Sequence, residues 1–265
     1  MHPVIKHLKA RAGRAGPFAD GRKIALVLWG GIMRAVRSGG AMVALQEMGL
    51  GQAFDSIYSV SAGFPVAAYF LSGRTRLGME LFYEELRSPR FLNRFRFWHG
   101  MDVSYLIRAM RHGKPLDVNA IFAGATRLYV RVVNFQSRKL EYFEIRELGQ
   151  AEFWPLVGAS VLVPILCRSR AKIKGEEYTE TNLNAHLKEH IRHVLKTEHT
   201  DILVIYNSRS QRRIKLEHNP RVLEIFPEKN WKLSRFEKDP NVLRTQGQYM
   251  ADLVCRVFEE KNIRI

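Results

Sequence analysis

The chain has 265 residues, of which 46% are hydrophobic, so it is long enough to bury a sizeable core as one large domain or two small ones. Its two cysteines, Cys167 and Cys255, have no paired spacing, which argues against a disulfide framework or a structural zinc site and favours a reducing, cytoplasmic setting. The net charge of +16 predicts attraction to polyanions, with nucleic acid and anionic lipid surfaces as the two candidates.

The first 22 residues are basic and lack the unbroken apolar core of a signal peptide. We interpret residues 1–22 as a basic, mobile arm ahead of one domain over residues 23–265. The longest uncharged run, residues 56–73, approaches the length of a membrane span. Serines, a glycine and a proline at its centre argue against a transmembrane helix.

Two strand–turn–helix units follow the arm. The first is "KIALVLWGG" (23–31) with "MRAVRSGGAMVALQEMGL" (33–50), and the second is "FDSIYSV" (54–60) with "FPVAAYFLSG" (64–73). Further on, "RLYVRVVNFQSRKLEYFEI" reads as a strand pair and "TDILVIYNS" as a buried strand that ends at polar residues. This alternation predicts an α/β fold of three layers, with a central, largely parallel sheet flanked by helices.

A serine lies in the turn of the second unit. Ser61 is followed by Ala62 and Gly63 and preceded at two residues by Ser59, so the turn resembles a GxSxG nucleophile elbow. Small neighbours let the backbone bend sharply, and the start of the next helix offers N–H groups to an oxyanion. Small residues also suit any tight turn, so this motif alone leaves both interpretations open.

Three motifs in order make the pattern more specific. "LVLWGGIMRAV" and "FDSIYSVSAGFPVAAYFLSG" are followed by "WPLVGASVLVPILCRSRAKIKGEEYTETNL". Together they resemble the patatin-like phospholipase family, whose motifs are GGGxRG, GxSxG and a later Asp-Gly-Gly or Asp-Gly-Ala. The resemblance spans roughly residues 23–208.

The resemblance implies a lipid acyl hydrolase of the phospholipase A or lysophospholipase type, with a serine–acid dyad that needs neither histidine nor a cofactor. Ser61 would be the nucleophile and Glu180 would take the place of the aspartate. A phospholipid or lysophospholipid substrate and contact with an anionic membrane surface are also implied. The oxyanion donors and the matching arginine would come from Gly30, Gly31, Ile32, Met33 and Arg34.

The chain departs from the family pattern at several positions. Ile32 replaces the third glycine, Ala35 the glycine after the arginine, Ser59 the first glycine of the elbow, and residues 180–182 the Asp-Gly-Gly. A β-branched residue resists a positive φ, so Ile32 is the harder change in the loop. The extra methylene of Glu180 moves its carboxylate by roughly an ångström, which can cost about a hundredfold in rate.

Three functions therefore stay open. They are a working lipid hydrolase, a catalytically impaired relative that binds lipid or anionic membrane, and a nucleic-acid-binding protein suggested by charge alone.

Other polar residues have structural alternatives. His186, His190 and His193 share one helical face, but basic neighbours favour a solvated basic helix over a metal site. Asp55 and Asp201 precede predicted strands, so we expect turn or capping roles for them.

The segment 87–115 interleaves arginines with aromatic residues. Its rings either pack into the core beneath solvated arginines or seat the protein peripherally on a membrane. For the arm we predict contact with anionic lipid through Lys6, Lys9, Arg11 and Arg14.

Overall fold

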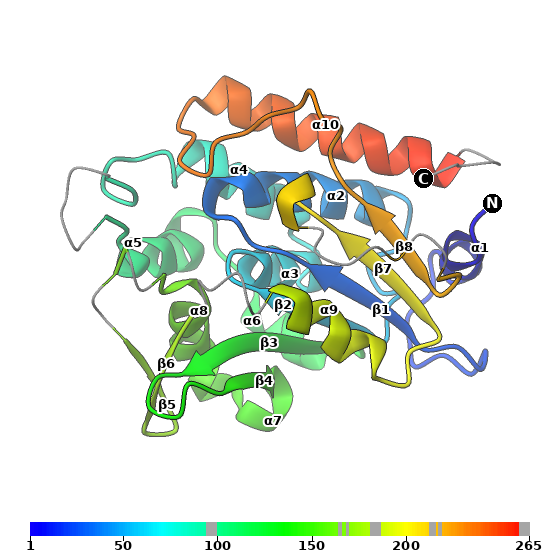
Figure 1. Ribbon diagram of the computed structural model, residues 1–265, viewed down its shortest axis with the longest axis horizontal. Helices are drawn as coiled ribbons and strands as arrows, with labels where there is room; N and C mark the ends of the chain where they lie inside the picture. The colour runs from blue at the N-terminus through cyan, green and yellow to red at the C-terminus, as the bar shows by residue number, and fades with distance from the viewer. Residues whose placement is uncertain are drawn as a thin grey trace.

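The computed structural model describes residues 1–93, 100–163, 166–167, 170–180, 187–211, 216 and 219–259, with only the backbone of residues 187–188. The described strands form one mixed sheet in the order β5-β6-β3-β2-β1-β7-β8, with β4 paired to β3 (Figure 1). The strands are β1 Ile24–Leu28, β2 Ser56–Val60, β3 Arg127–Asn134, β4 Leu140–Glu144, β5 Ala171–Ile173, β6 Glu176–Thr179, β7 Asp201–Ile205 and β8 Val222–Ile225.

The central strands are parallel, as predicted from the alternation of strands and helices. Strands β3, β2, β1, β7 and β8 run in one direction, whereas β4, β5 and β6 form antiparallel pairs. Every residue of β1, β2 and β7 is buried, which agrees with their short, mostly apolar sequences and with a sheet covered on both faces.

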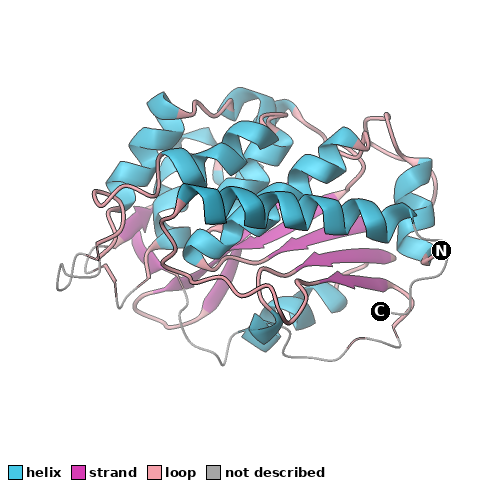
Figure 2. Cartoon of the chain, turned by 90° about the horizontal axis from the view of Figure 1, so that it is seen from above, coloured by secondary structure: helices cyan, strands magenta, loops and turns pink. Residues whose placement is uncertain are grey.

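Helices cover the two faces unequally, and most of them lie on one side of the sheet (Figure 2). Alternate residues of β1 point to each face: Leu26 and Leu28 join the large core under α2 and α3, while Val27 packs with α9 residues on the other face. The helices are α1 Pro3–Ala10, η1 Ile32–Ala35, α2 Val36–Glu47, α3 Gly63–Leu71, α4 Thr75–Glu84, α5 Val103–Arg108, η2 Ala109–Gly113, α6 Val118–Ala123, α7 Ile145–Leu148, η3 Gln150–Glu152, α8 Phe153–Val161, α9 Leu187–Leu195, η5 Arg209–Gln211 and α10 Pro240–Glu259.

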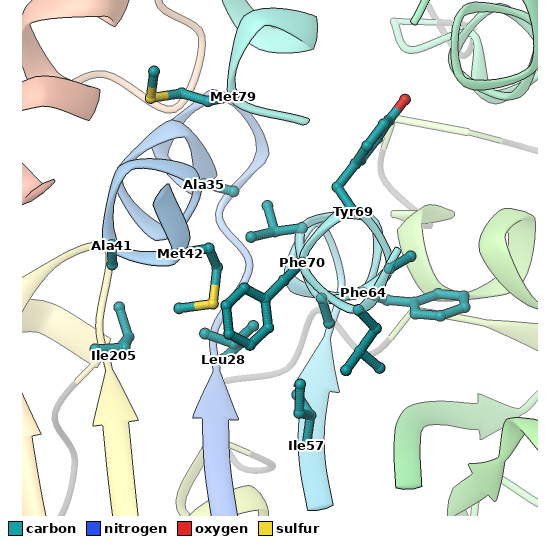
Figure 3. Packing of buried hydrophobic residues seen from close by; sticks show 14 of the residues in the cluster. Leu28, Ala35, Ala41, Met42, Ile57, Phe64, Tyr69, Phe70, Met79 and Ile205 are labelled. Carbon is teal, nitrogen blue, oxygen red and sulfur yellow. The ribbon is translucent and has the colours of Figure 1, made fainter. Parts of the chain in front are cut away.

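The large core lies where α2 and α3 pack above the central strands. Figure 3 shows Met42 of α2 and Phe70 of α3 over Leu28 of β1. These three side chains are at most 1% exposed. Because α2 and α3 each begin just after a parallel strand, this packing fixes the two turns that precede them at the same edge of the sheet.

The basic N-terminal segment differs from the free arm that its composition predicts. Val4, Ile5 and Leu8 of α1 are fully buried. The Arg11 guanidinium, also fully buried, forms ion pairs of 2.7 Å with both Asp20 and Asp55. The expectation of a mobile arm is therefore wrong for this segment, and Arg11 is not available for lipid; the division of the chain at residue 22 stays a prediction.

The two rival aspartates have structural roles at the amino ends of strands. Asp55 accepts a hydrogen bond from the Ile24 amide at 2.6 Å, and Asp201 is paired with His7 at 2.8 Å. The contact of Asp55 agrees with the interpretation of this residue as a capping group, whereas Asp201 pairs with a side chain of α1 instead of capping a backbone group.

The uncharged run 56–73 forms β2, a turn and α3. Within the described part of the chain, no helix combines the length and the apolar character needed to cross a membrane.

Candidate active site

Ser61 occupies the sharp turn between β2 and α3. Its φ is 55°, in the left-handed region that side chains rarely adopt, and such strain is typical of a serine at a nucleophile elbow. The residue is 6% exposed, and its carbonyl accepts the Phe64 amide at 2.9 Å. Ser59, by contrast, is fully buried within β2, and its hydroxyl donates to the Tyr129 carbonyl.

The loop after β1 packs directly against Ser61. A Cβ added at Gly30 would lie 2.4 Å from the Ser61 Cβ, 2.8 Å from its Oγ and 2.9 Å from the Ala62 amide nitrogen. Only glycine fits at this position without displacing the serine. In the same way, a Cβ on Gly63 would meet the Leu28 carbonyl oxygen at 3.0 Å, so the first turn of α3 lies close against the end of β1.

The glycine loop keeps a glycine-like backbone although it contains an isoleucine. Gly31 has a φ of 134°, and Ile32 has a φ of 56°, the conformation that a β-branched residue resists. A strained residue of this kind costs on the order of 1–3 kcal/mol, which the surrounding packing must offset.

The expected oxyanion donors divide into two groups. The Met33 amide donates to the Arg235 carbonyl at 3.3 Å, and the Arg34 amide donates to the Gly31 carbonyl at 3.1 Å, so both are engaged. No described residue accepts a hydrogen bond from the amides of Gly30, Gly31 or Ile32. Three of the five expected positions therefore have no acceptor among the described residues.

The Arg34 side chain does not face Ser61. Its Nε donates to the Leu233 carbonyl at 2.6 Å, and its side chain lines a different cleft. The Arg34 side chain is therefore not part of the lining that contains Ser61.

Asn207, which the sequence analysis did not single out, holds the glycine loop in place. It follows β7 and is fully buried, and its Nδ2 donates to the carbonyls of Trp29 and Gly30. Its Oδ1 accepts from the amide and the hydroxyl of Ser38 at 2.9 and 2.8 Å. The polar ending of the buried strand "TDILVIYNS" was the available signal.

Glu180 directly follows β6, and its amide donates to the Leu162 carbonyl at the end of α8 at 3.0 Å. Val60 of β2 pairs with Arg131 of β3, and Val133, two residues further along β3, pairs with Thr179. The sheet register thus brings the residue after β6 toward the residue after β2. The Ser61 side chain lies close enough to the Glu180 carboxyl to lower the pKa of that carboxyl.

The environment of the Glu180 carboxyl favours the protonated form more than water does. Burial raises the pKa of Glu180 to about 7, against the opposing effects of the Ser61 side chain and the positive charges of Arg131 and Arg235. Its Oε2 is buried with no hydrogen-bond partner in the described part of the chain, although the residue as a whole is partly exposed.

Arg131 is a second residue that the sequence analysis missed. It lies in the middle of β3 and is 1% exposed. Its positive charge acts on the carboxyl of Glu180, and burial lowers the pKa of the guanidinium, partly offset by Tyr142 and Glu180. An arginine within the apolar run "LYVRVV" was the signal, because a charge buried in a strand needs a partner.

An apolar channel of about 420 Å³, including its mouth, opens beside Ser61. Ser61 is the polar member of a lining that is otherwise apolar. Residues from the glycine loop, α3, α4, α5 and α8 form the wall, namely Ile32, Met33, Ala62, Pro65, Leu81, Phe82, Leu86, Phe91, Met101, Leu106, Val161 and Val163. An apolar lining of this kind suits the hydrocarbon part of a ligand.

The histidines form no metal site in the part of the chain that the structure describes. His190 is fully buried against Trp29 and hydrogen-bonded to Tyr142, which corrects the expectation of a wholly solvated helix, while His193 is exposed and stacks on Tyr142. His186, Thr181, Asn182 and residues 94–99 of the arginine–aromatic segment lie outside the described residues.

Within that segment, Phe91 is buried whereas Arg108 and Arg111 are exposed, and Arg111 lies over the Trp154 ring.

Comparisons with known proteins agree with this architecture. The structure of VipD from Legionella pneumophila is similar, with a TM-score of 0.51 and 12% identity over 91% of this chain and 68% of that one. ExoU from Pseudomonas aeruginosa, solved in complex with SpcU, matches with a TM-score of 0.37 and 15% identity over 89% of this chain and 52% of that one. A search of curated protein sequences found no significant match.

The family comparison is more direct. The family model for patatin-like phospholipase matches residues 26–181, more than half of the chain, and this range begins in β1 and ends just after Glu180. The chain therefore belongs to the patatin-like phospholipase family.

Proposed function

We propose that this protein hydrolyses the carboxylic esters of phospholipids or lysophospholipids, with Ser61 as the nucleophile and Glu180 as the general base. Family membership supports lipid hydrolysis in general. The observation that carries the finer proposal is the position of the Glu180 carboxyl close to Ser61, set by the sheet register, next to the glycine loop and the apolar channel.

In the first half of the reaction, the Ser61 Oγ attacks the acyl carbonyl while Glu180 takes the hydroxyl proton. The amides of Gly30, Gly31 and Ile32, with that of Ala62, hold the oxygen on which negative charge develops. The carbon–oxygen bond of the ester then breaks, and the leaving alcohol takes the proton from Glu180.

In the second half, a water molecule attacks the acyl–serine ester and gives its proton to Glu180. The fatty acid leaves and the proton returns to Ser61. A base with a pKa near 7 is well matched to both steps, since it exchanges protons readily at neutral pH.

A catalytically impaired lipid-binding protein is the alternative, because Glu180 stands where the family has an aspartate. The closeness of the Glu180 carboxyl to the Ser61 side chain favours a working dyad despite the extra methylene of the glutamate. The strained backbone conformations of Ile32 and Ser61 also favour a working site, because in such a site their positive φ values orient the loop amides and the serine hydroxyl toward the substrate. On this proposal the protein works at a membrane surface, as a peripheral cytoplasmic enzyme.

The test is fatty-acid release from phosphatidylcholine and lysophosphatidylcholine. Ser61→Ala and Glu180→Gln should each abolish release, and Glu180→Asp should lower it by pulling the carboxylate back from the serine. Ser59→Ala is the matched control, because its hydroxyl is buried and faces Tyr129. Unchanged turnover in Glu180→Gln would exclude Glu180 as the base, and higher turnover in Glu180→Asp would support the impaired alternative.

A further inference from the structure

A second cleft, distinct from the apolar channel, lies on the other side of the glycine loop. It has a volume of about 840 Å³ including its mouth, and its wall comes from η1, α2, the residues after β7 and the segment between β8 and α10, which is orange in Figure 1. The cleft and the channel share no lining residue, although η1 contributes Ile32 and Met33 to the channel and Arg34 to the cleft. We call it the basic cleft. Its cationic residues are Arg34, Arg37, Arg209, Lys229 and Lys232.

Two arginines form the base of the basic cleft. Arg37 is 2% exposed, and its guanidinium donates to the carbonyls of Asn207 and Trp231 and to the Gln246 side chain, all of them uncharged acceptors. Burial lowers its pKa to about 10, which leaves it protonated at neutral pH. Arg37 therefore contributes a buried positive charge, not free donors.

Arg34 contributes the free donors. Its Nε is bonded to the Leu233 carbonyl, but no described residue accepts a hydrogen bond from its Nη groups. Burial and the charge of Arg235 lower its pKa, so positive groups crowd this position. The two Nη groups present the fork of parallel N–H donors that matches a phosphate.

Three exposed cations, Arg209, Lys229 and Lys232, surround the mouth. None of the five cations of the basic cleft forms an ion pair with a carboxylate in the described residues. The acidic lining residue, Glu228, is paired with Arg256 at 3.5 Å. Five positive charges gathered with a single carboxylate in the lining repel one another, and a bound anion relieves that repulsion.

We infer that the basic cleft binds a phosphomonoester group, independently of the reaction at Ser61. A phosphomonoester carries close to two negative charges at neutral pH and several acceptor oxygens, which suits five cations better than a singly charged carboxylate or phosphodiester does. Such a group is found both on a phosphorylated lipid headgroup and on a soluble phosphate compound. When the phosphomonoester belongs to a lipid headgroup, its binding in the basic cleft holds the glycine loop near the membrane surface.

Isothermal titration of the full chain with phosphatidic acid vesicles and with glycerol phosphate, a soluble phosphomonoester, tests this inference. In the test variant Lys229→Glu/Lys232→Glu, we expect the Kd for the ligand of the cleft to rise about tenfold or more, because each basic residue near a charged surface adds about 1 kcal/mol, and 1.4 kcal/mol is a tenfold change. The control variant Lys139→Glu/Lys172→Glu changes the net charge equally at two exposed lysines outside the cleft, and its Kd should stay near that of the wild type.

The two ligands identify the source of the phosphate. If the test variant binds vesicles more weakly but glycerol phosphate as the wild type does, the ligand is a lipid headgroup. If it binds glycerol phosphate more weakly but vesicles as the wild type does, the ligand is a soluble compound. Equal losses in the test and control variants, or no loss in either, would overturn the inference. Ser61→Ala should bind both ligands as the wild type does, so failure of the hydrolase proposal and failure of this one are distinguishable.

Discussion

Gly30→Ala should inactivate the enzyme without unfolding it. The new Cβ would lie 2.4 Å from the Ser61 Cβ, whereas ordinary contacts begin near 3.4 Å, so Ser61 and the loop must separate by about 1 Å. A displacement of that size between a nucleophile and its oxyanion donors costs on the order of a hundredfold in rate. The assay is kcat/KM for a short-chain p-nitrophenyl ester, together with the midpoint of thermal unfolding.

Gly158→Ala in α8 is the matched control. Its Cβ would meet its nearest neighbour, Ala171, at 3.6 Å, an ordinary contact, and alanine favours a helix more than glycine does. This variant should keep wild-type activity. A folded Gly30→Ala protein with kcat/KM within about threefold of the wild type would refute the proposed packing of the oxyanion loop on Ser61.

Three further results are expected. First, kcat/KM should rise with pH and reach half its maximum near pH 7, because Glu180 acts as a base only after losing its proton. Arg131→Met should move this midpoint to higher pH, because the positive charge of Arg131 lowers the pKa of Glu180. A wild-type midpoint near 4.5, the ordinary pKa of glutamate, would contradict the effect of burial on Glu180. Second, Leu106→Phe narrows the apolar channel, so the rate of release of long acyl chains should fall at least tenfold relative to the rate of acetate ester hydrolysis. An equal effect on both substrates would exclude the channel as the acyl site. Third, Arg11→Met should lower the free energy of unfolding, measured in urea, by about 3 kcal/mol. This value is at the low end for a broken buried ion pair, because Asp20 and Asp55 are partly exposed. Arg14→Met, at an exposed arginine, should change the free energy of unfolding by less than about 0.5 kcal/mol.

The sequence predicted those parts of the fold that depend on local patterns. Apolar runs followed by small residues and then by helical spacing identified β1 and β2 with α2 and α3. The family pattern placed Gly30 and Ser61 in one site, and the two residues lie in contact where the parallel strands β1 and β2 end. Glu180 was assigned as the acid of the dyad from the family pattern, because no local sequence feature distinguishes it from its acidic neighbours.

Other features depend on contacts between distant residues. The positive φ of Ile32 is imposed by surrounding structure, which a propensity for one residue type does not reveal. Arg131 was overlooked because a hydrophobic pattern has no place for a buried cation, whose partners come from other elements. The error at the N-terminus is different: Val4, Ile5 and Leu8 already had helical spacing, and the basic composition of the segment hid it.

The most direct test of the central proposal is to locate the activated hydroxyl. The wild-type protein is treated with a fluorophosphonate probe, digested, and the modified peptide is sequenced by mass spectrometry. We expect a single adduct, on Ser61, which Glu180→Gln weakens and Ser61→Ala removes, because the Ser61 hydroxyl lies beside the Glu180 carboxyl and the glycine loop. Labelling that persists in Ser61→Ala, or that falls on Ser59, would contradict the assignment of Ser61 as the nucleophile.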